Sequence, residues 1–119
     1  MANMTLMDSE ECVMIVPLDS EGKETNLAMT VSKVDKYAPK KTGVYNVALM
    51  TKDPAEVAQQ WKYDRKSKAF FSRQHEKSAI FEGYNKNVFA FKYSAMKNQQ
   101  FLYDEGSSTL FNFFTENAI

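Results

Sequence analysis

Short apolar runs and a period-two alternation, rather than helical periods, dominate this sequence. Residues 12–16 form an apolar run rich in β-branched side chains, and residues 47–50 and 88–91 form two more runs of strand length. Trp61 and Tyr63 flank the polar Lys62, the period-two alternation typical of half-buried strands, and aromatic residues recur with the same spacing at 101 and 103. Polar, turn-like segments separate these runs. The pattern predicts an all-β fold made of many short strands.

The sequence also contains an internal repeat. The segment QQWKYD at 59–64 returns as QQFLYD at 99–104, an offset of 40 positions. Six of the thirteen aligned positions from 59 to 71 are identical to their counterparts from 99 to 111, whereas chance gives about one. Each copy can be read as four short strands. The repeat therefore predicts that one four-stranded unit occurs at least twice.

The N-terminal third of the chain should hold a first copy, although no counterpart of Trp61 occurs near position 21. Three copies, at about 1–41, 42–81 and 82–119, would each carry four strands. That arithmetic predicts a β-trefoil with pseudo-threefold symmetry. A chain of 119 residues is long enough for one such domain, 1–119, and too short for a second core.

The charge balance argues against a nucleic-acid partner. Fifteen basic and fifteen acidic residues cancel, whereas nucleic-acid binders usually carry a basic surplus that releases counterions. Three further features set the expected location. Cys12 is the only cysteine, so no intrachain disulfide forms. The first residues lack a signal-peptide pattern, and no run approaches the roughly 20 apolar residues of a membrane span. We expect a cytoplasmic protein without a membrane partner.

The recurring motif resembles that of the ricin B-type (QxW) lectin family. Gln59-Gln60-Trp61 matches Gln-x-Trp, and Gln99-Gln100-Phe101 matches it with Phe in place of Trp; Tyr and Asp follow in both copies. The resemblance covers residues 43–119. Residues 1–42 fit it only because their number is about that of one repeat. It implies a β-trefoil in which the motif aromatics Trp61 and Phe101 pack into the core.

The same resemblance implies a galactose-type sugar site in the third repeat. Asn98 and Gln99 reproduce the Asn-Gln pair that contacts sugar hydroxyls, and Phe91 or Tyr93 could supply the stacking ring. Glu82 stands near the position of the family's aspartate. In the second copy Ala58 replaces Asn98, so only one site is expected. A single site would be weak, and a homo-oligomer would add avidity.

Two other interpretations remain open. The motif glutamines and aromatics could serve only the scaffold, with the amides satisfying backbone groups. Alternatively, the domain could bind a protein, as a protease inhibitor or cytoskeletal binder, through the long loop from Ser32 to Thr42, which contains a basic cluster. An enzyme is not expected, and neither is a cofactor or metal, because His75 and Cys12 lie in different copies and no set of acid, base and nucleophile converges.

Overall fold

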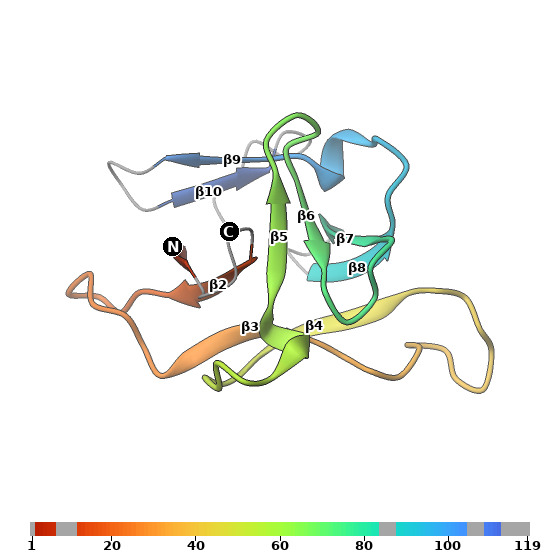
Figure 1. Ribbon diagram of the computed structural model, residues 1–119, viewed down its shortest axis with the longest axis horizontal. Coiled ribbons are helices and arrows are strands. Elements are labelled where there is room, and N and C mark those ends of the chain that lie inside the picture. Colours follow the sequence, from red (N-terminus) through yellow and green to blue (C-terminus); the bar gives the residue numbers. More distant parts are fainter. Residues whose placement is uncertain (1, 7–11, 84–87, 105–108, 113–119) are drawn as a thin grey trace.

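The computed structural model describes residues 2–6, 12–83, 88–104 and 109–112; for residues 2–6, 103–104 and 109–112 it describes the backbone only. The regular elements of the described chain are strands and 3₁₀ turns, and none of them is an α-helix (Figure 1). Its elements are β1 Ala2–Leu6, β2 Cys12–Pro17, β3 Leu27–Val31, β4 Tyr45–Thr51, η1 Val57–Gln59, β5 Trp61–Asp64, β6 Ala69–Ser72, β7 Ser78–Glu82, β8 Val88–Lys92, η3 Lys97–Gln99, β9 Phe101–Asp104 and β10 Thr109–Asn112. The predicted all-β class is confirmed.

Most strands belong to one antiparallel sheet. It has eight strands in the order β1-β2-β5-β6-β7-β8-β4-β3, while β9 and β10 form a separate hairpin. β3, at one end of this order, packs beside β2, near the other end. The sheet therefore nearly closes on itself as a barrel.

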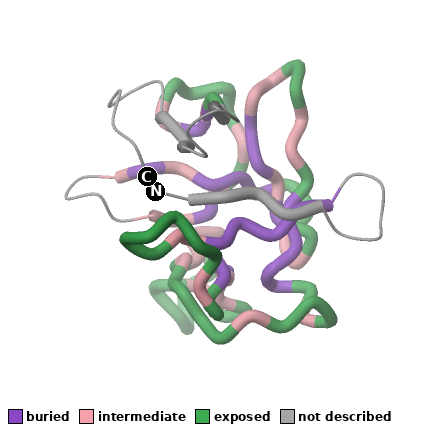
Figure 2. The backbone as a smooth tube through the Cα atoms, turned by 90° about the vertical axis from the view of Figure 1, so that its left-hand side faces the viewer, coloured by how far each residue is buried: buried purple, intermediate pink, exposed green. Residues whose placement is uncertain are grey.

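The interior of this barrel holds the main hydrophobic core. Side chains alternate along each strand, so every second residue of β2, β3, β5, β7 and β8 faces inward. The buried core residues are Val13, Ile15, Met29, Val31, Ala58, Trp61, Phe70, Ile80, Ala90 and Phe101. A smaller cluster of Met14, Val16 and Ala28 lies apart from it, so β2 is buried on both faces. Figure 2 shows these buried segments in the middle of the molecule and the exposed loops around them.

The internal repeat corresponds to a structural unit that occurs twice. In each copy a 3₁₀ turn leads into a β-hairpin, η1 into β5–β6 and η3 into β9–β10. Trp61 pairs with Ser72, and Phe101 pairs with Asn112, so the hairpin registers match at the same 40-residue offset. Both motif aromatics are fully buried. The expected packing of these two rings into the core is confirmed.

The two copies also bond to one another. The Tyr63 hydroxyl donates to the carbonyl oxygen of Phe101 at 2.9 Å, and the Phe101 amide donates to the carbonyl oxygen of Lys68 at 2.8 Å. Residues 1–41 contribute β1, β2 and β3 to the large sheet. The described part of that segment contains no 3₁₀ turn like η1 or η3. The arrangement of three complete copies thus stays a prediction.

The first glutamine of each motif ties its 3₁₀ turn to the end of the preceding strand. Gln59 and Gln99 are each only 2% exposed. Gln59 Oε1 accepts from the Asp53 amide at 2.8 Å and its Nε2 donates to the Thr51 carbonyl at 2.8 Å.

In the third repeat, Gln99 Oε1 accepts from the Ser94 amide at 2.9 Å, and its Nε2 donates to the carbonyls of Phe91 and Lys92 at 3.3 and 3.1 Å. A buried amide needs such partners. The equivalent bonds in both copies explain why glutamine recurs there.

Replacing Gln99 by alanine should lower the free energy of unfolding by about 1–3 kcal/mol, because the buried backbone groups it serves would lose their partners. Chemical denaturation of the purified protein measures this change. Gln100→Ala is the matched control. Gln100 is half-buried, and its side-chain amide donates to the Ala95 carbonyl at 3.3 Å. Equal losses in the two variants would contradict this role for Gln99.

Candidate functional site

The proposed sugar-binding residues of the third repeat lie on neighbouring elements. Glu82 ends β7, Phe91 lies in β8, Tyr93 follows that strand, and Asn98 and Gln99 belong to η3. β7 pairs with β8, and η3 packs against β7. The fold therefore brings the five residues into one region of the molecule.

Two of these residues lie in the interior. Glu82 is only 4% exposed, in β7 opposite Val88. Both polar atoms of the Gln99 amide are bonded to the chain itself. These positions favour the scaffold interpretation of Gln99 and Glu82 over direct contact with a sugar. Asn98 is half-buried, at the edge of the same region.

Phe91 and Tyr93 belong to a larger group of rings on the outer face of the sheet. Ile80 and Ala90 point into the core, so the residues that alternate with them point outward. We call this group the aromatic band; it consists of the half-buried rings of Phe71, Phe81, Phe89, Phe91 and Tyr93.

Edge-to-face and tilted contacts connect the rings of the aromatic band. Phe81 lies 6.3 Å from Phe91 and 5.4 Å from Phe89, measured between ring centroids. Tyr93 meets Phe71 edge-on at 5.2 Å. Fully buried Ala79 pairs with both Phe71 and Phe91, so its small side chain lies between the two parts of the band.

Sequence reasoning missed Phe71, Phe81 and Phe89. Phe89 and Phe91 are spaced by two along one strand, which places them on the same face. That spacing could have added Phe89 to the site. Phe71 and Phe81 lie on β6 and β7, and only the pairing of β6 with β7 and of β7 with β8 brings them beside β8.

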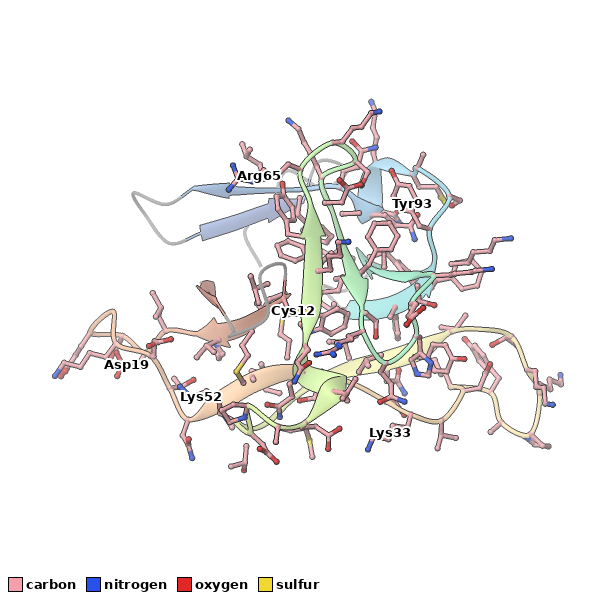
Figure 3. All side chains as sticks on the ribbon, in the orientation of Figure 1. Cys12, Asp19, Lys33, Lys52, Arg65 and Tyr93 are labelled. Carbon is pink, nitrogen blue, oxygen red and sulfur yellow. The ribbon has the colours of Figure 1, made fainter. Side chains whose placement is uncertain are left out.

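A cleft of about 600 Å³ opens next to the aromatic band, over β2, β5 and β6. Its lining residues are Cys12, Lys62, Asp64, Phe71, Ser72, Arg73 and Glu76. Phe71 belongs to both the cleft and the band. Figure 3 shows Cys12 and Tyr93 on opposite sides of the β5–β6 hairpin.

Hydrogen bonds hold two charged groups of the cleft in place. The Ser67 hydroxyl and the Lys66 amide donate to the Asp64 carboxylate and hold its pKa below the ordinary value, so Asp64 is ionised at neutral pH. On the other side, Arg73 Nη1 donates to Gln60 Oε1. Gln60 is itself fixed, because its Nε2 donates to the Pro54 carbonyl at 3.0 Å.

The basic loop between β3 and β4 forms a second distinct surface. The Asp35 carboxylate accepts from the Tyr37 amide at 2.9 Å, the Thr42 hydroxyl at 2.8 Å and the Gly43 amide at 2.7 Å. Desolvation raises the pKa of Asp35, but these hydrogen bonds together outweigh it and lower the pKa below its ordinary value. We call residues 32–43 the Asp35 loop. Its Val34 and Tyr37 side chains are 61% and 51% exposed.

Two other kinds of site are not found in the described ranges. No helix there combines the length and apolar character needed to cross a bilayer. Nor do three or more His, Cys, Asp or Glu side chains of those ranges gather where they could hold a metal ion.

Comparison with known proteins gives a likeness in structure without one in sequence. No protein-family model matches the chain, and no curated protein sequence matches it. Among solved structures, the β-trefoil lectin of the Vibrio vulnificus hemolysin/cytolysin, with N-acetyl-D-lactosamine bound, is similar at a TM-score of 0.67 and 14% identity. The match covers 88% of this chain and 69% of that one. At this identity the likeness shows the fold alone: the chain is similar in fold to a β-trefoil.

Proposed function

We propose that this chain is a non-catalytic domain that binds a galactose-type glycan through its third repeat. One observation carries the proposal: Phe91 and Tyr93 lie half-buried on the outer face of the sheet, within a band of aromatic rings. The similar Vibrio lectin has N-acetyl-D-lactosamine bound, a disaccharide that contains galactose. The rings and the fold thus favour the same class of ligand.

The chemistry of a neutral sugar suits this surface. A galactose ring has an apolar C–H face that stacks on an aromatic ring, and hydroxyls that both donate and accept hydrogen bonds. Tyr93 is the best stacking ring because it lies beyond the end of β8, and the amide of the next residue, Ser94, donates to Gln99 of η3. Since Gln99 and Glu82 are buried, and the carbonyl oxygen of the Asn98 side chain is buried as well, the amide nitrogen of Asn98 is the remaining predicted contact for a sugar hydroxyl.

We place this domain in the cytoplasm, as a trefoil of three four-stranded copies. Cys12 is a buried free thiol, which is compatible with a reducing compartment. A single sugar site would bind weakly, near millimolar. Homo-oligomers would raise the avidity by presenting several sites at once.

Tyr93→Ala should weaken binding to galactose-terminated glycans about two- to tenfold, because loss of one stacking ring costs roughly 0.5–1.5 kcal/mol. A glycan array followed by titration of the strongest hit with wild type and variant measures this. The matched control is Tyr37→Ala, which removes an exposed tyrosine from the Asp35 loop. Undiminished binding by Tyr93→Ala would remove Tyr93 from the site, and an array without hits would contradict the proposed function.

The exposed side chains of the Asp35 loop favour a second candidate function, which is binding of a protein partner such as a protease or a cytoskeletal protein. Val34 and Tyr37 stand exposed on a loop that the Asp35 carboxylate holds in shape. A preorganised loop loses little conformational entropy on binding. For this function, Tyr37→Ala should abolish inhibition of a protease panel or capture of a cytoskeletal partner, while Tyr93→Ala should leave it intact.

Asp35→Ala should loosen the Asp35 loop, because the Tyr37 and Gly43 amides and the Thr42 hydroxyl lose their shared acceptor. Trypsin should then cleave after the loop lysines several times faster than in wild type, as followed by mass spectrometry. The control is Asp19→Ala, which removes an exposed carboxylate that accepts from the Glu21 and Lys23 amides in a different loop. It should leave cleavage within the Asp35 loop unchanged. Unchanged cleavage within residues 33–41 would show that Asp35 does not order the loop.

A further inference from the structure

We infer that the cleft over β2, β5 and β6 binds a second sugar residue of the same glycan, so that the ligand is an oligosaccharide rather than a single galactose. This inference rests on the proposed function and extends its site into the second repeat. Sequence reasoning assigned no sugar contact there, because Ala58 replaces the asparagine of the third repeat.

Phe71 connects the two halves of this extended site. Its ring lines the cleft and also meets Tyr93 at a centroid distance of 5.2 Å. If one sugar residue stacks on Tyr93, the next residue of the glycan would therefore lie at Phe71, which lines the cleft. The cleft volume of about 600 Å³ lies within the range of small-molecule sites, about 300–1,000 Å³.

The polar lining of the cleft suits a neutral polyhydroxylated ligand. Two cationic side chains, Lys62 and Arg73, face the same cleft as two carboxylates, Asp64 and Glu76. These charges balance, so a ligand with a net charge would meet repulsion as well as attraction. Sugar hydroxyls, in contrast, donate to carboxylates and accept from ammonium and guanidinium groups.

The groups that would make these bonds are already in position. Asp64 is fixed by the Ser67 hydroxyl at 2.7 Å and the Lys66 amide at 3.2 Å, and Arg73 is fixed by Gln60. Preorganised side chains lose less conformational entropy when a ligand binds. Phe71 adds an aromatic face beside them for the C–H face of the sugar.

Calorimetric titration with three probes tests the inference: galactose, lactose, and lacto-N-tetraose, a tetrasaccharide with a terminal galactose. Wild-type protein should bind lacto-N-tetraose at least tenfold more tightly than galactose. Arg73→Gln and Glu76→Gln should each reduce the ratio of lacto-N-tetraose affinity to galactose affinity severalfold. The affinity for galactose itself should stay unchanged, because the monosaccharide binds at Tyr93 and does not reach the cleft. Both positions are exposed, so the variants should fold.

Arg65→Gln is the matched control, since Arg65 is exposed and does not line the cleft. It should preserve the ratio of tetrasaccharide to galactose affinity. If wild type binds all three probes equally, or if the cleft variants keep the full ratio, the inference is wrong and the proposed function stands. If wild type binds none of the probes, a galactose-type ligand is excluded and both proposals fail.

Discussion

The fold depends on satisfying two buried glutamine amides. Gln59 and Gln99 lie where water cannot reach, yet each side chain bonds to backbone groups at the end of the preceding strand. An unsatisfied amide there would cost more than most single contacts contribute. These bonds set where each 3₁₀ turn ends and where the next strand begins. The strands that follow begin with Trp61 and Phe101, and both of these rings are fully buried.

Strand alternation then divides each strand between a core face and an outer face. Ile80 and Ala90 fill the interior, while Phe81, Phe89 and Phe91 beside them in sequence point outward and belong to the aromatic band. Short strands bury few residues each. Burial of each inward-facing ring therefore contributes a large share of the core's stability, about 1.5–3 kcal/mol of the free energy of unfolding. The same geometry leaves the outward rings half-buried, and that surface carries the proposed glycan site.

The candidate site could be predicted only in part. Phe91 and Tyr93 were predicted as stacking rings because they lie shortly before the motif in sequence, and both lie on the outer face of the sheet. The same motif predicted that Gln99 contacts sugar hydroxyls. A pattern of residues, however, cannot distinguish a side-chain amide that faces solvent from one enclosed by backbone groups. Glu82 likewise follows the strand alternation into the interior.

The sequence by itself determined the all-β class and the repeated unit, because period-two alternation and a recurring motif are local properties of the chain. Tertiary structure decided which rings share a surface. Phe71 and Phe91 are distant in sequence, and they belong to one band only because β6, β7 and β8 pair side by side around Ala79. The cleft likewise exists only because β2 pairs with β5, which brings Cys12 opposite Lys62.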